Sequence, residues 1–475
     1  MIATSADVGA LAATFERLRG AVRRAPAWTL AERRDRLRAL ERAILRRRRA
    51  IRQALWDDFR KPAFETDATE IIVTLAELRH SRTHLREWMT PERVATPPSL
   101  FGASSEIRYE PKGVVLILGP WNYPFQLVFA PLVAALAAGN RALLRPSEKT
   151  PHTRAVIETI VADAFSPDDV AFAGGEADAA AYLTTLPFDH LFFTGSTAVG
   201  HRVMSAAANT LASVTLELGG KSPAILAPDA DIAHAAAKIA WGKGVNGGQT
   251  CIAPDYVLAP RDRVPALAAA LGERFAVMYG ATPQARMASP DFCRIIDDSA
   301  FARITAKLDT TLAGGATLAF GGARDAASRY IEPTIVTGVT FDAPLMHEEI
   351  FGPILPIVAY DDLDTALAVL RTQPKPLALY AFGSRRTSLE RILAVPAGGI
   401  TVNDTLLHFA NPSVPFGGAG ASGMGAYHGR AGFRALSHEK AVVRMGPLGT
   451  VSTLYPPFGA RARAALTVLD RILSR

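Results

Sequence analysis

A cysteine follows directly on a loop of small residues. Residues 246–250 read Asn-Gly-Gly-Gln-Thr and lead into Cys251. Glycines let the backbone approach a thiol closely, and a thiolate is a strong nucleophile. The alternative is a buried structural cysteine, the usual fate of a free cysteine. The loop makes Cys251 a candidate nucleophile, whereas Cys293, which has no such setting, is expected to serve packing.

A glutamate lies between two leucines at the end of an apolar strand. Residues 216–220 read Leu-Glu-Leu-Gly-Gly, with the carboxylate at Glu217. Burial raises the pKa of a carboxyl group towards neutrality, which suits a general base. The alternative is a glutamate paired with an arginine or lysine at the edge of the sheet. Both interpretations stay open on the residues alone.

An asparagine lies on a turn that leaves another apolar strand. Residues 119–124 read Gly-Pro-Trp-Asn-Tyr-Pro and place Asn122 in the turn. Turns after parallel strands are where α/β sheets build their sites, and an amide held there can donate to a developing oxyanion. The alternative is an asparagine that caps the turn.

Strands and helices alternate along most of the chain and must position these residues. Apolar runs are predicted as strands at 114–118, 141–145, 191–194, 222–226, 255–258, 334–339, 354–360 and 377–382. Helices are predicted at 125–138, 151–164, 197–208, 229–243, 300–312 and 362–370. Fully apolar strands separated by helices imply parallel sheets covered on both faces. Because the pattern repeats with different content after residue 220, two doubly wound α/β domains are predicted.

The positive charge is concentrated near the N-terminus. The 475 residues carry a formal net charge of +7, and four consecutive arginines begin at Arg46. A basic helix can bind nucleic acid or a membrane surface. The helical spacing of Leu37, Leu40, Ile44 and Ile51 instead indicates a solvated helix with its apolar side packed inward, and no aromatic residues interleave for base stacking. No nucleic-acid partner is expected.

Cysteine usage and hydropathy bear on the compartment. Two cysteines form no disulfide framework and fit a reducing compartment, and the N-terminus has no secretory pattern. Residues 114–139 carry no charge, but Pro120 and Pro124 interrupt them, so a buried strand, turn and helix are predicted rather than a transmembrane segment. A cytoplasmic protein is expected, and the charged tail, 460–475, at most touches a membrane surface weakly.

Four motifs occur in the order typical of one enzyme superfamily. They are Phe-Thr-Gly-Ser-Thr-Ala-Val-Gly at 193–200, the Glu217 segment, the Cys251 segment and Glu-Glu-Ile-Phe-Gly-Pro at 348–353. With the Asn122 turn they resemble the aldehyde dehydrogenase superfamily. Three further motifs resemble its class 3, which includes fatty aldehyde and bacterial coniferyl aldehyde dehydrogenases; they are Trp-Gly-Lys at 241–243, Ile-Ala-Pro-Asp-Tyr at 252–256 and Ser-Gly-Met-Gly-Ala-Tyr-His-Gly at 422–429.

The resemblance implies a covalent mechanism. The Cys251 thiolate attacks the aldehyde carbon, and Asn122 with the cysteine's own amide holds the oxyanion of the thiohemiacetal. Loss of hydride leaves a thioester, which water activated by Glu217 hydrolyses. Aliphatic or aromatic aldehydes are expected, in a channel lined by Tyr123, Trp241, Thr250 and Ile252. No metal is expected.

The resemblance also implies NAD or NADP, bound without a Gly-x-Gly-x-x-Gly loop. Gly195 and Ser196 open a helix whose N-terminal amides suit a pyrophosphate. The other residues expected at the cofactor are Trp121, Arg145, Glu148, Glu349 and Phe351. Lysine is usual in the family where Arg145 stands, and arginine can bind a ribose hydroxyl or a 2′-phosphate. Because Glu148 repels that phosphate, NAD is expected and NADP stays open.

Three parts are predicted along the chain. A discontinuous, Rossmann-like cofactor domain comprises residues 1–91, 110–218 and 414–436, and a catalytic domain comprises residues 219–413. A small β oligomerisation arm and a C-terminal tail comprise residues 92–109 and 437–475. Class 3 enzymes resemble one another in forming homodimers, so a homodimer paired through this arm is expected.

Three other functions fit part of the pattern. A coenzyme A-acylating enzyme of the same superfamily typically lacks the base that Glu217 supplies. A cysteine hydrolase needs a histidine near Cys251, and none of the ten histidines lies in a matching motif. A non-catalytic dimeric scaffold has no use for Cys251, Glu217 and Asn122 together.

Overall fold

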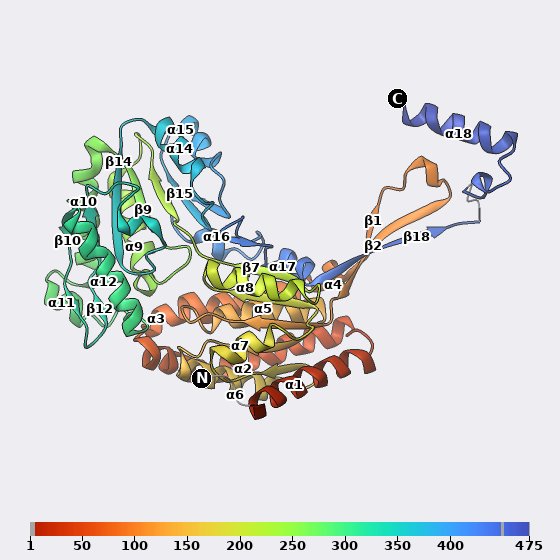
Figure 1. Ribbon diagram of the computed structural model, residues 1–475, viewed down its shortest axis with the longest axis horizontal. Helices are drawn as coiled ribbons and strands as arrows, with labels where there is room; N and C mark the ends of the chain where they lie inside the picture. Colours follow the sequence, from red (N-terminus) through yellow and green to blue (C-terminus); the bar gives the residue numbers. More distant parts are fainter. Residues whose placement is uncertain (1–4, 448–450, 475) are drawn as a thin grey trace.

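The chain is built around two large β-sheets and a smaller one that forms a projecting arm (Figure 1). The computed structural model describes residues 5–447 and 451–474. Residues 1–4, 448–450 and 475, which the sequence assigns to the cofactor domain and to the arm and tail, lie outside the described residues.

The first large sheet has six strands in the order β17-β7-β6-β3-β4-β5. Their bounds, in that order, are Gly423–Met424, Ser213–Glu217, His190–Thr194, Val114–Leu118, Arg141–Arg145 and Val170–Phe172. Strands β3 to β7 are parallel, and β17 pairs antiparallel with β7. The order reverses at β3, since β4 and β5 lie on one side of it and β6 and β7 on the other. Sheets of this kind bind ligands at the carboxyl ends of the strands where the order reverses.

Helices cover both faces of this sheet. One face is covered by α1 (Ser5–Arg24), α7 (Ala177–Leu183) and α8 (Thr197–Ala208). The other is covered by α2 (Leu30–Phe59), α4 (Ile72–Met89), α5 (Gln126–Ala138) and α6 (Pro151–Ala164). Within β3, Leu116 packs with the first group and Val115 and Ile117 with the second. The strand is apolar throughout because neither of its faces meets water.

The basic helix α2 is buried on one side and solvated on the other. Leu37, Leu40, Ile44 and Ile51 are at most 1% exposed, whereas Arg46 is exposed. The predicted inward packing of this helix is confirmed. The uncharged residues 114–139 likewise form β3, a turn and the buried helix α5, as predicted. Among the described residues, no helix combines the length and the apolar character needed to cross a bilayer.

The second large sheet has seven strands in the order β10-β13-β14-β9-β8-β15-β16. Their bounds, in that order, are Thr317–Phe320, Thr334–Thr337, Ile354–Tyr360, Tyr256–Pro260, Pro223–Leu226, Ala378–Phe382 and Gly399–Val402. All neighbouring strands are parallel except β10 and β13. One face is covered by α9 (Ile232–Gly244) and α10 (Val264–Tyr279), and the other by α12 (Asp298–Ala313), α14 (Leu363–Thr372) and α15 (Arg386–Leu393).

The prediction of two doubly wound α/β sheets is confirmed. The antiparallel edge strands β10 and β17 were outside that prediction, because β10 has only four residues and β17 only two. Short elements complete the body: α3 (Ala63–Thr66), α11 (Pro283–Ala288), β11 (Arg324–Asp325), β12 (Tyr330–Ile331), α13 (Pro344–His347), α16 (Leu407–Ala410) and α17 (Gly429–Ala435). The 3₁₀ and π turns are η1 (Asp67–Ile71), η2 (Pro98–Leu100), η3 (Val245–Gly248), η4 (Arg261–Arg263) and η5 (Val451–Leu454).

The arm is a three-stranded antiparallel sheet in the order β1-β2-β18. Its strands are β1 (Glu92–Val94), β2 (Ala103–Pro111) and β18 (Ser437–Met445). It projects from the two large sheets, and helix α18 (Ala460–Leu473) lies beyond its far end (Figure 1). Segments more than 300 residues apart in the chain thus pair along their whole length in β2 and β18.

Candidate active site

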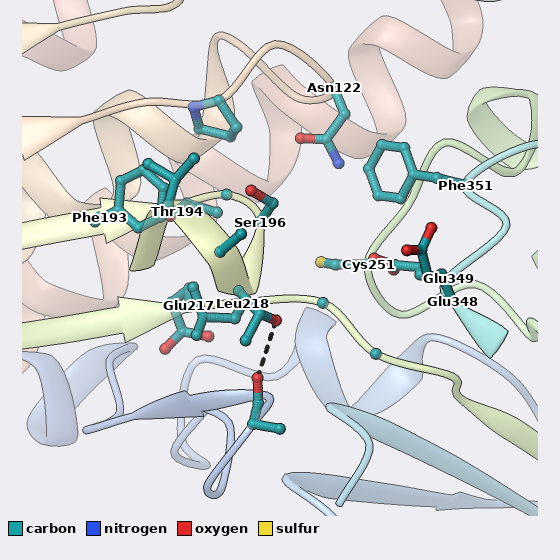
Figure 2. Close-up of a pocket in the computed structure, with 18 of the residues that line it drawn as sticks. Asn122, Phe193, Thr194, Ser196, Glu217, Leu218, Cys251, Glu348, Glu349 and Phe351 are labelled. Atoms are coloured by element: carbon teal, nitrogen blue, oxygen red, sulfur yellow. Dashed lines mark hydrogen bonds between the residues drawn. The ribbon is translucent and has the colours of Figure 1, made fainter. Parts of the chain in front are cut away.

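A cavity of about 1,070 Å³ lies at the carboxyl ends of β3, β6 and β7 and is lined from both large sheets. All ten residues predicted for catalysis or for the cofactor line it: Trp121, Asn122, Arg145, Glu148, Gly195, Ser196, Glu217, Cys251, Glu349 and Phe351. Figure 2 shows most of them around the same pocket. The structure therefore brings together residues that are as far as 230 positions apart in the chain (121 to 351).

Glu217 is the last residue of β7 and is only 2% exposed. Neither of its carboxylate oxygens finds a hydrogen-bond partner among the described residues. Burial therefore raises the pKa of Glu217 well above its usual range. The alternative interpretation, an ion pair at the edge of the sheet, does not hold. In Figure 2 the carboxylate points away from the Cys251 sulfur, so contact with a group bound there needs a water molecule or a side-chain rotation.

The loop before Cys251 has an unusual backbone. Three consecutive residues have positive φ angles, +54° at Asn246, +58° at Gly247 and +71° at Gly248. This left-handed region favours glycine. At Gly248 a Cβ would also overlap the carbonyl oxygen of Gly352. The glycines of the motif are therefore needed both for the conformation and for close packing.

The Cys251 sulfur points into the pocket (Figure 2). Burial raises the pKa of this thiol, and the nearby carboxylates of Glu349 and Glu217 raise it further. The thiol is therefore protonated at neutral pH until a positive charge or a base favours the thiolate. Cys293 is also a free thiol, but it is 2% exposed and part of the apolar core, as the sequence suggested.

Asn122 lies in the turn between β3 and α5 and is 4% exposed. Its amide Nδ2 donates to the carbonyl oxygen of Gln249 at 3.1 Å, two residues before Cys251. The backbone carbonyl oxygen of Asn122 accepts a hydrogen bond from Nδ2 of Asn246 at 2.9 Å. The amide thus bonds across to the cysteine loop rather than within its own turn.

Glu349 lines the cavity on the other side of the Cys251 sulfur from Glu217 (Figure 2). Burial raises the pKa of Glu349 to about 8, and the nearby backbone N–H of Gly220 acts against that rise. At Gly219 a Cβ would overlap the Glu349 carboxylate, so this close approach requires glycine. Lys221 supports the segment that precedes Glu349, because its Nζ donates to the carbonyl oxygens of Leu345 at 2.9 Å and Glu348 at 3.2 Å.

Lys243 is a buried charge that sequence reasoning did not single out. It is 1% exposed, and burial lowers its pKa to about 8. Asp255 Oδ1 lies 3.9 Å from its Nζ, and the same Oδ1 accepts the backbone N–H of Ile350 at 3.1 Å. The charge of Glu349 also acts on Lys243. Lys243 belongs to a helix with helical apolar spacing, so only the fold reveals that its side chain faces inward.

The first turn of α8 faces the cavity. Ser196 is its N-cap, and the serine side chain makes no capping hydrogen bond to the described chain. Ser196, Thr197 and Ala198 all line the cavity. The N-terminal amides of a helix and its dipole favour an anionic group at this position. Gly195 permits the turn, because a Cβ there would overlap the Phe193 ring.

Arg145 and Glu148 lie side by side, as the sequence placed them. The Arg145 guanidinium is 2% exposed and donates to Glu148 Oε2 at 3.1 Å. It also donates to the carbonyl oxygens of Gly175 and Glu176, each at 2.9 Å. Protein acceptors therefore take up much of its donor capacity. Near the thiol, the rings of Trp121 and Phe351 meet edge to face at 5.2 Å.

The four residues predicted for the substrate channel do not line this cavity. Tyr123 is buried, and its hydroxyl lies 2.7 Å from Oγ1 of Thr250. Ile252 is buried, and its carbonyl oxygen accepts from the Tyr380 hydroxyl. Trp241 is 41% exposed. Their role in a channel stays a prediction.

Comparison with known proteins gives a consistent result. The sequence pattern of the family described as "Aldehyde dehydrogenase family" matches residues 3–442. The chain is 43% identical to 4,4'-diaponeurosporen-aldehyde dehydrogenase of Staphylococcus aureus, over 86% of this chain and 88% of that protein. It is 41% identical to a probable coniferyl aldehyde dehydrogenase of Pseudomonas aeruginosa (95% and 94% covered) and 40% identical to mouse aldehyde dehydrogenase family 3 member A2 (93% and 90% covered).

The structure is similar to a solved NAD⁺ complex of an aldehyde dehydrogenase from Bacillus cereus. The TM-score is 0.84 at 27% identity, and the match covers 92% of this chain and 89% of that one.

Replacing Gly248 tests the fit of the cysteine loop. Gly248→Ala combines a left-handed φ of +71° with the overlap at Gly352, whereas Gly315→Ala has a φ of +100° and no neighbour within 4 Å. Backbone strain of this kind costs about 1–3 kcal/mol. Because of the overlap, we expect Gly248→Ala to lower the free energy of unfolding more than Gly315→Ala does. Urea unfolding and the rate at which iodoacetamide alkylates Cys251 measure this. Equal losses of stability and an unchanged alkylation rate in Gly248→Ala would contradict it.

Proposed function

The chain belongs to the aldehyde dehydrogenase family, whose members oxidise aldehydes to carboxylic acids with a nicotinamide cofactor, and we propose that Cys251, Asn122 and Glu217 carry out this reaction. The observation that carries the proposal is the convergence of three groups on one cavity. They are a thiol, an amide donor and a buried carboxylate without a partner in the described chain. The Glu217 carboxylate also favours hydrolysis over transfer to coenzyme A.

The chemistry follows from these groups in order. The Cys251 thiolate adds to the aldehyde carbon, and the carbonyl oxygen becomes an oxyanion that the amides of Asn122 and Cys251 stabilise. Loss of hydride from the thiohemiacetal leaves a thioester on the sulfur. Glu217, with a raised pKa, then takes a proton from water as the water attacks the thioester. The products are the carboxylic acid and the restored thiol.

The nicotinamide cofactor accepts the hydride. The residues present fit it: Glu349 and the Trp121–Phe351 pair lie at the thiol end of the cavity. The open first turn of α8 suits a pyrophosphate. At the far end, Glu148 repels a 2′-phosphate and Arg145 already bonds to protein oxygens. These two residues support NAD over NADP.

Apolar aldehydes fit the surroundings of the thiol. Cys251 packs against an apolar cluster that includes Ile252, Phe416 and Tyr427. A carboxylate carried by the substrate would be desolvated against this apolar cluster. We therefore place aliphatic and aromatic aldehydes ahead of semialdehydes that carry a second carboxylate.

The three-part division remains our proposal, with the first large sheet in the cofactor domain and the second in residues 219–413. The strand bounds support it, since β8 to β16 lie between 223 and 402.

We also propose that the protein is a cytoplasmic homodimer. Two free cysteines support a reducing compartment. Exposed apolar side chains on the arm, Val94, Val443 and Met445, support pairing there. We propose that the charged α18 touches a membrane surface weakly at most.

Variants of the thiol and the carboxylate separate the two half-reactions. We expect Cys251→Ala to abolish oxidation and Cys293→Ala to retain it. Glu217→Gln should form about one NADH per site in a burst and then turn over at least 100-fold more slowly, as for the loss of a general base.

Because the pKa values of Cys251 and Glu217 are raised and their deprotonated forms react, wild-type kcat/KM should rise from pH 6 to pH 9. Stopped-flow absorbance measures the NADH burst of Glu217→Gln and the wild-type rate at each pH. Full turnover by Cys251→Ala would refute the mechanism.

A substrate panel tests specificity. Hexanal, decanal and benzaldehyde should each give a kcat/KM at least tenfold above that of succinic semialdehyde. NAD should give a higher kcat/KM than NADP. Initial rates with both cofactors in parallel decide this, and a preference for succinic semialdehyde would overturn the proposed substrate class.

The assembly is tested on the arm. Light scattering of the full chain should give twice the mass of 50.7 kDa. Val443→Asp places a charge in the proposed interface and should shift the mass to that of one chain. A monomeric wild-type protein would contradict the homodimer.

A further inference from the structure

Two charged side chains that the mechanism does not use are fully buried beside the active site. Lys61 and Glu70 are each 0% exposed, and Lys61 Nζ lies 2.7 Å from Glu70 Oε1. The same Nζ lies 3.9 Å above the ring of Tyr123, next to Asn122 in the chain. Desolvation of two charges offsets much of their attraction, so such a pair is weak support for stability alone. A role in geometry explains it better.

The other oxygen of Glu70 holds the donor loop, which we define as residues 119–125 around Asn122. Glu70 Oε2 accepts the backbone N–H groups of Phe125 and Gln126, each at 3.0 Å. These amides begin α5, where N–H groups have no partner within the helix and a carboxylate is favoured by the dipole. Lys61 fixes one oxygen of Glu70 and α5 the other, so the carboxylate cannot turn without breaking three bonds.

Glu65 holds the nucleophile loop, defined as residues 245–251. Its Oε1 accepts the backbone N–H of Asn246 at 2.7 Å, at the first of the three left-handed residues. Burial raises the pKa of Glu65 to about 7, and the charge of Lys61 and this hydrogen bond act against that rise. The hydrogen bond therefore joins the strained start of the loop to the same short segment that carries Glu70.

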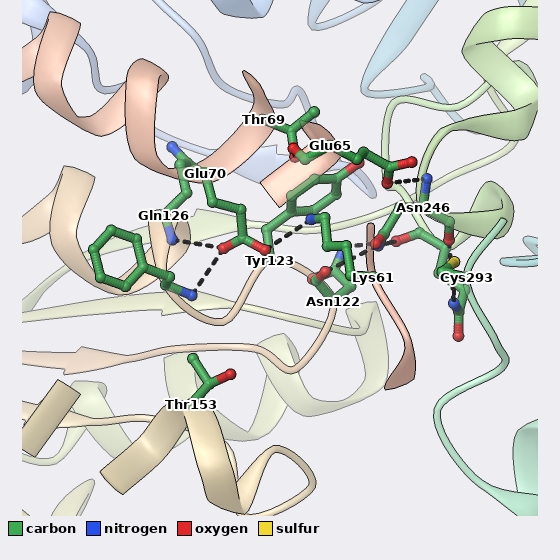
Figure 3. Close-up of polar contacts among 12 residues, drawn as sticks. Lys61, Glu65, Thr69, Glu70, Asn122, Tyr123, Gln126, Thr153, Asn246 and Cys293 are labelled. Atoms are coloured by element: carbon green, nitrogen blue, oxygen red, sulfur yellow. Dashed lines mark hydrogen bonds and ion pairs between the residues drawn. The ribbon is translucent and has the colours of Figure 1, made fainter. Parts of the chain in front are cut away.

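The two loops are also joined directly to each other. Asn122 Nδ2 donates to Gln249 O, and Tyr123 Oη lies 2.7 Å from Thr250 Oγ1. Figure 3 shows Lys61, Glu65 and Glu70 beside Asn122 and Asn246, with the contacts between Lys61 and Glu70 and between Glu65 and Asn246 dashed. Residues 61–70 form the bracing segment, which includes α3 and enters the π turn η1. Turns of this rare type are frequent at functional sites.

We propose that Glu65 and Glu70 are positioning residues that fix the oxyanion donor and the nucleophile relative to each other from one bracing segment. Glu70 sets the donor loop, and Glu65 sets the nucleophile loop. The proposal rests on the roles proposed above for Asn122 and Cys251. A displacement of about 1 Å at such a site costs roughly 100-fold in rate.

The Glu65 variants test this without leaving a buried charge unpaired, because Lys61 keeps Glu70. Glu65→Leu removes the acceptor for the Asn246 N–H and should lower kcat at least tenfold, with the Kd for NAD changed less than twofold. Glu65→Gln retains an acceptor oxygen and should keep kcat within threefold of wild type. Unchanged kcat in Glu65→Leu, or equal losses in both variants, would overturn the role of Glu65.

Glu70 has a matched control elsewhere in the fold. Glu332 is also buried (1% exposed), pairs with Arg286 at 2.6 Å and accepts the backbone N–H of Ala323 at 2.9 Å, away from both loops. Glu70→Gln and Glu332→Gln should lower Tm by similar amounts, but only Glu70→Gln should lower kcat at least tenfold. Equal effects on kcat would show a merely structural role. If Glu70→Gln does not fold, the Glu65 pair decides the proposal.

The outcome is separable from that of the proposed mechanism. An active Cys251→Ala refutes the mechanism whatever the Glu65 and Glu70 variants do. An inactive Cys251→Ala together with a fully active Glu65→Leu refutes only the positioning role.

Discussion

The left-handed backbone of Asn246, Gly247 and Gly248 turns Cys251 back towards the carboxyl ends of the first large sheet, although Cys251 precedes β9 of the second. Each non-glycine residue in this conformation costs about 1–2 kcal/mol, and the buried amides of the loop need partners. Asn246 donates to Glu65, to Asn122 and to Gln249 of its own loop, so two distant segments and the loop itself hold this conformation. The position of Cys251 at the cavity depends on this loop.

Burial governs the electrostatics of the site. Glu217 and Glu349 line the same cavity as Cys251, and burial raises the pKa of all three. Two carboxyl groups and a thiol with raised pKa values hold little negative charge until a cation or a base shifts the balance. In such a low-dielectric site, a positive charge or a well-placed amide acts more strongly than it would in water. The same burial that disfavours the thiolate therefore makes its stabilisation by a bound cation effective.

Sequence periodicity predicted the regular elements well where both ends had a clear signal. The helix predicted at 151–164 begins at a proline and has those bounds in α6, and the strands predicted at 114–118 and 354–360 have those bounds in β3 and β14. The bracing segment escaped prediction. Lys61, Glu65 and Glu70 belong to none of the motifs that the sequence offered, because nothing in a single sequence shows that another loop covers them. The channel residues are also unsettled, since Tyr123 and Thr250 bond to each other in a buried contact.

Residue types and their order determined the family of this protein: a thiol after a glycine loop, a carboxylate at a strand end and an amide on a turn predicted the reacting groups and indicated the family. These signals are local, because glycine in a tight turn and apolar residues in a covered strand are required whatever the rest of the chain does. Only the tertiary structure decided that Glu217 lacks a partner among the described residues, that Lys243 faces inward and that Glu65 and Glu70 brace the two loops. Burial and long-range hydrogen bonds depend on which segments meet, and the chain order of residues does not specify that.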